Sequence, residues 1–171
     1  MNQTAIIFAT RKGGTRRIVQ KLKDAIDTEN VDLIDLKENT DPDLAPYQAV
    51  ILGGPVYAGK LFPPVYDFAV AHEQSLMNKK LGLFLCGMNE PEFDAQMERS
   101  FSENLRNRAV SRQILGGEFD FSKLNWIERF LIKRITGIKK TTQKYRQDCI
   151  DKLVDAFKVN DTMEKSVVNE S

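Results

Sequence analysis

Short apolar runs alternate along the chain with segments whose apolar residues recur every three or four positions. The runs predict five buried strands, at 5–9, 31–36, 49–52, 81–85 and 113–115. Helical spacing predicts a helix after the first, third and fourth strands, a further amphipathic helix from Trp126 to Ile138, and a last helix marked by Tyr145, Cys149, Leu153 and Phe157. The polar stretch 37–48 after the second strand holds Pro42 and Pro46 and is expected to be mostly loop. The apolar residues Met97, Phe101 and Leu105 are expected on one helix, the one after the fourth strand.

Alternating strands and helices indicate an α/β fold, a three-layer sandwich in which helices cover both faces of a parallel sheet. For five strands we expect the order 2-1-3-4-5, with an inserted helix between strand 5 and the last helix. Residues 1–159 are expected to form one domain, and the polar segment 160–171 a disordered tail. Ligands of such sheets bind beyond the carboxyl ends of the strands, where strands 1 and 3 meet.

The loop after the first strand joins hydroxyl side chains and glycines directly before a helix. It consists of Thr10, Arg11, Lys12, Gly13, Gly14 and Thr15. The glycines let several backbone N–H groups converge, and the helix N-terminus adds free donors and a favourable dipole. The loop is therefore suited to a phosphate monoester. An ordinary glycine turn with a threonine cap is the alternative that the residues leave open.

The loops after the third and fourth strands are candidates for holding a planar ring. The residues expected there are Pro55, Val56, Tyr57, Ala58 and Gly59 in the first loop, and Gly87, Met88 and Asn89 in the second. Glycines, including Gly53 and Gly54 at the end of strand 3, permit close approach of a ligand, and Tyr57 can stack on it. A rigid turn and a plain strand-to-helix connection are the alternative interpretations of these two loops.

Several other phosphate-binding motifs are absent from the sequence. It contains neither GxxxxGK[ST] nor GxGxxG, which excludes a P-loop and a dinucleotide fingerprint. The third strand ends in Leu52-Gly53 rather than in the Asp of a response regulator. A low-molecular-weight phosphatase needs a cysteine in the loop after strand 1, and this loop has none. No pair of side chains suggests acid–base catalysis, and no metal site is expected.

Together, the three loops resemble the FMN site of flavodoxins. The resemblance implies that 10–15 bind the FMN phosphate, that Tyr57 covers one ring face, that the backbone of 57–59 meets flavin N5, and that 87–89 line the pyrimidine edge. It also implies that the flavin itself carries the redox chemistry. Arg11 and Lys12 depart from the mostly neutral phosphate loop of small flavodoxins, and they either add charge at the phosphate or point to solvent.

A closer resemblance covers nearly the whole chain. TRKGGTRRI (10–18) is similar to the T-R-x-G-x-T-R-x-I start of menaquinone-dependent protoporphyrinogen IX dehydrogenases, and WIERFLIK (126–133) to their W-x-[DE]-R-F-x-I-K segment. That family oxidises protoporphyrinogen IX in haem biosynthesis and passes electrons to a membrane quinone. The segment before Trp126 is poorer in Arg and Tyr than the family. An electron carrier for a protein partner and a flavin-free binding module are the two alternatives.

The net charge of +1 is unevenly distributed. Between Trp126 and Arg146 the only acid is Glu128, and the bases are Arg129, Lys133, Arg134, Lys139, Lys140, Lys144 and Arg146. The amphipathic helix from Trp126 to Ile138 has three interpretations: it lies in a membrane interface, it binds the propionates of a porphyrin, or it packs on the body with a solvated basic face. A near-neutral chain with a basic segment is unlike the strongly acidic electron-shuttle flavodoxins.

The two cysteines, Cys86 and Cys149, predict neither a disulfide framework nor a zinc site and suit a reducing compartment. Both are expected to fill space, and His72 is expected to be a solvated helix residue. The apolar run near the N-terminus is too short for a signal peptide, and no stretch is long enough to span a membrane. We therefore expect a cytoplasmic protein, with peripheral membrane contact through the amphipathic helix and no nucleic-acid partner.

Overall fold

The computed structural model describes residues 3–27, 29–119, 125–136 and 142–169. Its centre is a sheet in the order β2-β1-β3-β5-β6, in which all of these neighbours pair in parallel. The strands are β1 (Thr4–Phe8), β2 (Val31–Asp35), β3 (Ala49–Tyr57), β5 (Lys80–Cys86) and β6 (Ser111–Ile114). This arrangement confirms the predicted order of five strands. A short strand, β4 (Lys60–Leu61), pairs antiparallel with the end of β3.

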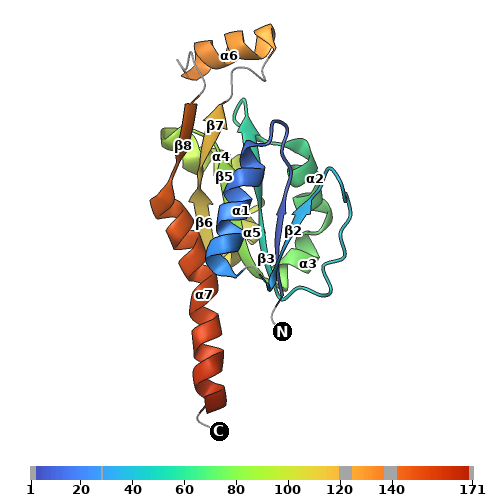
Figure 1. Ribbon diagram of the computed structural model, residues 1–171. Helices are drawn as coiled ribbons and strands as arrows, with labels where there is room; N and C mark the ends of the chain where they lie inside the picture. Colours follow the sequence, from blue (N-terminus) through green and yellow to red (C-terminus); the bar gives the residue numbers. More distant parts are fainter. Residues whose placement is uncertain (1–2, 28, 120–124, 137–141, 170–171) are drawn as a thin grey trace.

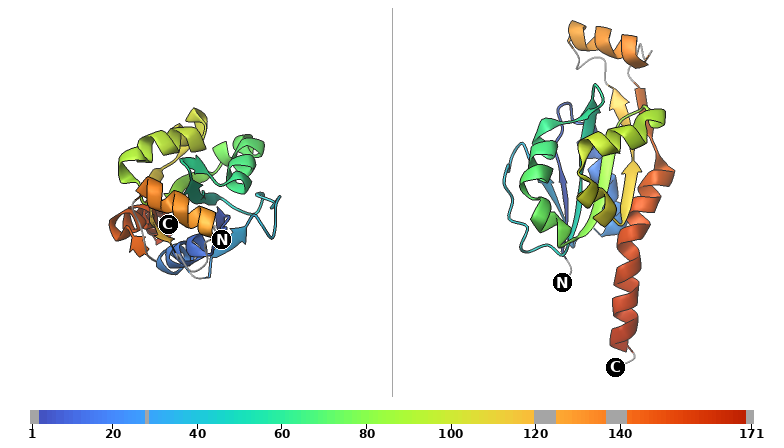
Figure 2. Two further views of the ribbon diagram at one scale, coloured as in Figure 1. Left: turned by 90° about the horizontal axis from the view of Figure 1, so that it is seen from above. Right: turned by 180° about the vertical axis from the view of Figure 1, so that it is seen from behind.

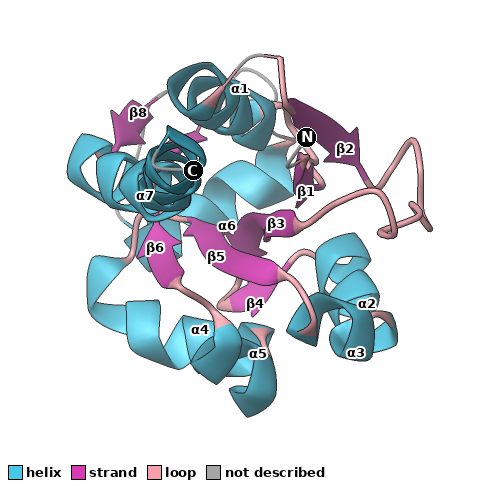
Figure 3. Cartoon of the chain, turned by 90° about the horizontal axis from the view of Figure 1, so that it is seen from below, coloured by secondary structure: helices cyan, strands magenta, loops and turns pink. Residues whose placement is uncertain are grey.

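Helices cover both faces of the sheet (Figure 3). The helices α1 (Gly14–Ile26) and α7 (Gln147–Asn169) pack on the face that carries Phe8, Ile51 and Phe84. The opposite face is covered by α2 (Pro63–Ala71), α3 (Glu73–Met77), α4 (Phe93–Ser100) and α5 (Glu103–Arg108). Successive strand residues point to opposite faces, so each buried strand supplies both layers. A fully buried side chain such as Phe84 stabilises the fold by about 2–3 kcal/mol.

Strand β3 continues to Tyr57 instead of ending at Leu52 as the apolar run predicts. Gly53 and Gly54 therefore lie inside the strand, where neighbouring residues occupy the space that a side chain would need. A Cβ on Gly53 would collide with the carbonyl oxygen and ring of Phe84, and one on Gly54 would lie 2.9 Å from Cγ2 of Val65. These two glycines serve helix and strand packing, whereas the sequence suggested the approach of a planar ligand.

The single helix expected through Met97, Phe101 and Leu105 is wrong, because the chain breaks between α4 and α5. Phe101 is extended, with φ −134° and ψ 144°. Ser102 then caps α5 by accepting a hydrogen bond from the Leu105 N–H at 3.3 Å. A serine cap in the middle of an apolar pattern of period four restarts the helix. The apolar residues still reach one core, since all three are buried.

Between β6 and α7 the chain forms an excursion that the sequence predicts only in part. The strands β7 (Gly116–Phe119) and β8 (Thr142–Tyr145) form an antiparallel ribbon, and α6 (Trp126–Thr136) lies at its far end (Figure 1). The inserted helix was expected, but the ribbon was not, and Tyr145 lies in β8 rather than in the last helix. Residues 137–138 of the expected helix lie outside the described residues, as do Lys139 and Lys140 of the basic segment.

The last helix runs from Gln147 to Asn169 and projects past the sheet (Figure 2). Cys149, Leu153 and Phe157 are buried against the sheet, as their spacing predicts. That residues 160–171 form a disordered tail stays a prediction, although α7 extends into this segment.

Candidate cofactor site

The loop between β1 and α1 has the geometry of an anion-binding turn. Gly13 is the N-cap residue of α1 and has φ +87°, a left-handed conformation that favours glycine. Its N–H donates to Oγ1 of Thr10 at 2.9 Å, which closes the turn. No described side chain caps the α1 N-terminus, and its first turn holds no acid. The helix therefore presents free N–H groups and a positive dipole end at the mouth of the loop.

Thr15, the last residue of this loop, is buried and turned inward. Its hydroxyl is hydrogen-bonded to Cys86 at the end of β5. Burial raises the pKa of the Cys86 thiol to about 12, while the Thr15 contact lowers it by a smaller amount. Cys86 therefore stays a protonated thiol and fills space, as predicted. Cys149 is also buried, and burial is the main cause of its raised pKa.

Two cations of the loop, Arg11 and Lys12, are paired with a residue of the distant helix α6. Nη2 of Arg11 lies 3.0 Å from Oε1 of Glu128, and Nζ of Lys12 lies 3.5 Å from Oε2. The sequence left open whether these cations meet the phosphate or point to solvent. Instead, the structure brings them to a carboxylate from a segment more than a hundred positions further along the chain.

Tyr57 lies next to this cation cluster. The Arg11 guanidinium carbon is 5.9 Å from the centroid of the Tyr57 ring, and Phe62 meets that ring edge-on at 5.7 Å. Burial raises the pKa of Tyr57 to about 12, against the opposing effect of Arg11. The ring is thus held at the same edge of the sheet as the first loop, where it was expected.

The turn after Tyr57 is tight and is held by α4. Ala58 has φ 49° and Gly59 has φ 75°, and β4 follows directly. Nε of Arg99 donates to the Gly59 carbonyl at 3.2 Å. Before the turn, Pro55 lies in β3, where its carbonyl accepts from the Phe62 N–H at 2.9 Å, and Val56 pairs with Leu61.

The third loop follows β5 and contains Gly87, Met88 and Asn89. The Gly87 N–H is already committed to the carbonyl of Gly116 at 2.9 Å, so donors from this loop toward a ring would have to come from its other two residues. Behind Gly87 lies Gln96 of α4, a buried side chain whose Oε1 has no hydrogen-bond partner among the described residues. An orphaned buried acceptor costs about 1–3 kcal/mol, so this atom calls for a donor.

The three loops meet at the carboxyl edge of the sheet, and α6 crosses above them (Figure 2). The sequence missed three residues that shape this region: Glu128, Gln96 and Arg99. Glu128 carried a signal, since it is the only acid in a basic segment. Gln96 and Arg99 carried none, because nothing local to α4 reveals that they meet loops from other strands.

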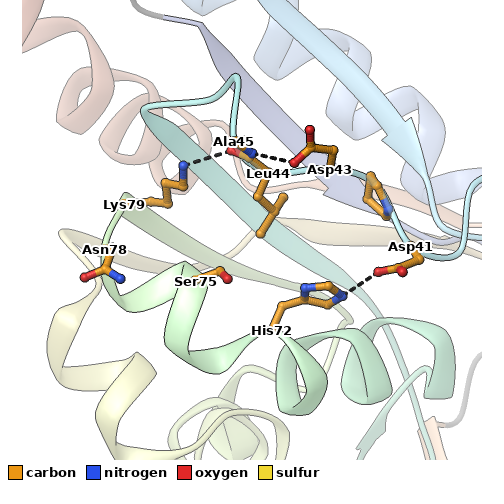
Figure 4. A pocket seen from close by; sticks show the side chains of 9 residues that line it. Asp41, Asp43, Leu44, Ala45, His72, Ser75, Asn78 and Lys79 are labelled. Atoms are coloured by element: carbon orange, nitrogen blue, oxygen red, sulfur yellow. Dashed lines mark hydrogen bonds and ion pairs between the residues drawn. The ribbon is translucent and has the colours of Figure 1, made fainter.

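The structure also contains a depression of about 540 Å³ away from this edge (Figure 4). It lies between the 41–45 loop and α3, near the amino ends of β3 and β5. There Nε2 of His72 pairs with Asp41 at 2.8 Å, and Nζ of Lys79 donates to the carbonyls of Leu44 and Tyr47 at 2.8 and 2.6 Å. His72 also stacks on Phe68 at 4.3 Å. These contacts fasten the long loop after β2, so His72 is more tightly held than the sequence predicts.

Among the described helices, none combines the length and the apolar character needed to cross a membrane.

Comparison with known proteins agrees with this architecture. Residues 5–146 match the model of the family described as flavodoxin domain. No curated protein sequence matches the chain significantly. Among solved structures, oxidised Flavodoxin 2 from Bacillus cereus is 25% identical with a TM-score of 0.52, over 67% of this chain and 82% of that one. A short-chain flavodoxin associated with a bacterial microcompartment has a TM-score of 0.55 at 14% identity, over 92% and 97% of the two chains.

The second likeness supports the fold alone, and so does a third, to the flavodiiron protein of Giardia intestinalis. That match has a TM-score of 0.50 at 13% identity and covers 92% of this chain but 35% of the other. The family match spans the central sheet, the three loops and the α6 excursion. This chain belongs to the flavodoxin domain family.

Proposed function

We propose that this chain binds FMN at the carboxyl edge of its sheet and transfers electrons through it. The observation that carries the proposal is the 10–15 loop, in which a left-handed Gly13, an uncapped helix N-terminus and two cations converge. These are the features that hold a phosphate monoester. The family of the chain and the neighbouring Tyr57 ring make a flavin mononucleotide the ligand that fits best.

The loops at this edge offer residues that would hold the phosphate and the ring of FMN. The phosphate would be held by the α1 N-terminus with Thr10, Arg11 and Lys12. Tyr57 offers an aromatic face, and its position is fixed by Phe62. The orphaned Oε1 of Gln96 lies behind the third loop and is suited to accept a hydrogen bond once a ligand orders that loop.

When bound, FMN supplies the electron- or hydride-accepting chemistry. The chain itself binds and orients the cofactor. Tyr57 stays neutral at physiological pH, since its raised pKa keeps the phenol protonated. Cys86 behind the first loop is also a neutral thiol, so neither group adds a negative charge near the ring.

The finer proposal is an FMN-dependent oxidoreductase that oxidises protoporphyrinogen IX and passes the electrons to a quinone, in haem biosynthesis. The support is the similarity of 10–18 and 126–133 to the dehydrogenase family, together with the position of the inserted helix. That helix lies above the three loops and carries Arg129, Lys133 and Arg134. Arginine and lysine suit the propionates of a porphyrin through charge-assisted hydrogen bonds.

An anaerobic mixing experiment tests the finer proposal. The FMN-loaded protein is mixed with protoporphyrinogen IX in the absence of oxygen, and the flavin absorption band and porphyrin fluorescence are followed together. The proposal predicts that flavin bleaches while protoporphyrin forms, and that added menaquinone restores the flavin band. Retention of the oxidised spectrum with porphyrinogen in excess would rule out this substrate.

A second candidate is an electron carrier that serves a protein partner. It is favoured by the similarity to Flavodoxin 2 from Bacillus cereus, whose crystal structure is of the oxidised protein. An electron carrier would leave protoporphyrinogen unchanged in the mixing experiment but would still be reduced by dithionite and reoxidised by a redox protein. A flavin-free module would show no flavin spectrum at all.

The partner that we propose for α6 is a membrane surface, where a quinone would be reached. Trp126 is 79% exposed and Phe130 is 56% exposed, and Ile127 and Leu131 are also open to solvent. The interpretation in which this apolar face packs on the body therefore does not describe these four side chains. An exposed apolar face with a tryptophan, beside basic residues, is typical of helices that lie in a membrane interface.

A further inference from the structure

At the contact between α6 and the 10–15 loop, the carboxylate of Glu128 lies beside the two cations that are expected to bind a phosphate. Glu128 reaches Arg11 and Lys12 at 3.0 and 3.5 Å, and it connects through both of its oxygens. Its side chain is only 16% exposed, although most described residues of α6 are open to solvent. Glu128 thus connects this helix to the 10–15 loop.

The same carboxylate also helps to cap the N-terminus of α6. Oε2 of Glu128 accepts from the Asn125 N–H at 3.1 Å, and the Glu128 N–H donates to Oδ1 of Asn125 at 2.8 Å. This reciprocal pair is a capping box, in which a glutamine can replace the glutamate. Partial burial opposes ionisation, but the Asn125 N–H and the two cations outweigh it, so the pKa of Glu128 lies below its usual value. The group is an anion at neutral pH.

We propose that Glu128 competes with the flavin phosphate for Arg11 and Lys12, so that phosphate binding releases α6 from the loop. This inference rests on the proposed function. A phosphate monoester carries nearly two negative charges at pH 7, and it can also accept from the N–H groups of the α1 N-terminus. A single carboxylate is therefore the weaker ligand of the pair of cations, and the dianion displaces it.

The proposal explains the two cations that distinguish this loop. Without phosphate, Glu128 pairs with both cations and offsets part of their charge, and Arg11 lies near the Tyr57 ring. When phosphate takes the cations, Glu128 keeps its capping box with Asn125, so α6 remains helical while its ion pairs with the 10–15 loop are lost. Occupancy of the cofactor site would thereby free the helix that carries the exposed apolar face.

The substitution Glu128→Gln tests the competition without removing the capping box. It is compared with Glu98→Gln, an exposed position on α4 away from the loop. For FMN we expect an affinity about three- to tenfold higher in E128Q than in the wild type, since the two ion pairs of Glu128 no longer compete with the phosphate. Riboflavin, which lacks the phosphate, should bind equally to both, and E98Q should behave as wild type.

A second measurement follows α6 directly, because Trp126 is the only tryptophan of the chain. Inorganic phosphate is colourless and does not quench through energy transfer. Titrating it should change the emission of Trp126 and its quenching by acrylamide in the wild type, with no such change in E128Q. Sodium chloride at equal ionic strength is the control for screening.

The outcomes separate this inference from the proposed function. Equal FMN affinities of wild type and E128Q, or a lower affinity of E128Q, would overturn the competition even if FMN binds well. If neither protein binds FMN, the proposed function fails, and the phosphate titration still decides the inference. A Trp126 response that depends on Glu128 supports it, and an unchanged Trp126 signal overturns it.

Discussion

At the scale of single residues, Gly13 and Gly14 have different tasks although they are adjacent. Gly13 adopts φ +87° with open space around its missing Cβ, so only the backbone requires glycine there. Gly14 is the first residue of α1 and has no positive φ. From the sequence alone, both residues are expected to let the backbone N–H groups of the loop converge.

Replacing these glycines by alanine should therefore affect the free energy of unfolding differently. Gly13→Ala should lower the free energy of unfolding by about 1 kcal/mol, because alanine is strained in the left-handed region. Gly14→Ala should leave it unchanged or raise it by up to about 1 kcal/mol, since alanine favours helix. Urea unfolding of the cofactor-free proteins measures both, and equal losses would show that φ at Gly13 is not the constraint.

A substitution at Gln96 should raise the stability of the cofactor-free protein while it weakens FMN binding. Its buried Oε1 has no partner in the described structure, so Gln96→Met should stabilise the cofactor-free protein by up to about 1 kcal/mol. If that oxygen accepts a hydrogen bond in the complex, the same substitution should weaken FMN binding about fivefold or more. Thermal unfolding and FMN titration of the one variant test both parts. A variant that loses stability in the absence of flavin would contradict the assignment.

Tyr57 makes a prediction about alkaline pH. Burial raises its pKa from 10 in the unfolded chain to about 12, so the folded state retains a proton that the unfolded state releases. Its contribution to stability is therefore complete below about pH 10 and is lost as the pH rises toward 12. Tyr57→Phe should lose less stability than the wild type over this range, measured by urea unfolding. Tyr66→Phe, at an exposed position of α2, is the control, and identical pH profiles of Tyr57→Phe and wild type would refute the effect.

At the scale of elements, the sequence predicted what depends on local pattern. The five main strands follow from apolar runs, and α1 follows from Ile18 and Leu22 at helical spacing. The break at Phe101 was missed because Ser102 caps a helix inside an unbroken apolar period. The β7–β8 ribbon was missed because its strands pair across the inserted helix, and no short window of sequence contains both partners.

The candidate site divides in the same way. Residues 10–15 and Tyr57 could be placed at the carboxyl edge of the sheet from the sequence because they follow recognisable apolar runs, and that they bind a cofactor stays a prediction. Glu128 could not be placed, since its partners Arg11 and Lys12 are distant in sequence and only the fold brings them together. The roles of Gly53 and Gly54 could not be seen either, because Phe84 and Val65 belong to other elements.

The exposed face of α6 leads to a prediction about lipid. Trp126→Ser combined with Phe130→Ser should reduce binding to vesicles of anionic phospholipid about tenfold or more, because two large apolar side chains no longer enter the interface. FMN affinity and thermal stability should stay within error, since both residues are exposed. Val110→Ser, an exposed apolar position outside α6, is the control. Vesicle binding that is weak in the wild type, or unchanged in the double variant, would exclude a membrane role for this helix.

At the scale of the whole molecule, the two ends of the sheet are distinct. At the amino end, His72 and Lys79 hold the long loop after β2 in place, so the polar contacts there stabilise the fold. At the carboxyl end, the three loops and α6 gather cations, an aromatic ring and an orphaned acceptor. This division is the one expected of an open parallel sheet, whose ligands bind beyond the carboxyl ends of its strands.

Flavin binding at the carboxyl edge is tested most directly by a titration of the purified protein with FMN, followed by visible absorption. We expect saturation at one FMN per chain at micromolar concentrations, with shifted flavin bands, and weaker binding of riboflavin because it offers no phosphate to the 10–15 loop. A flavin spectrum that stays that of free FMN throughout the titration would contradict FMN binding, and the loop would then be an ordinary glycine turn at the start of α1.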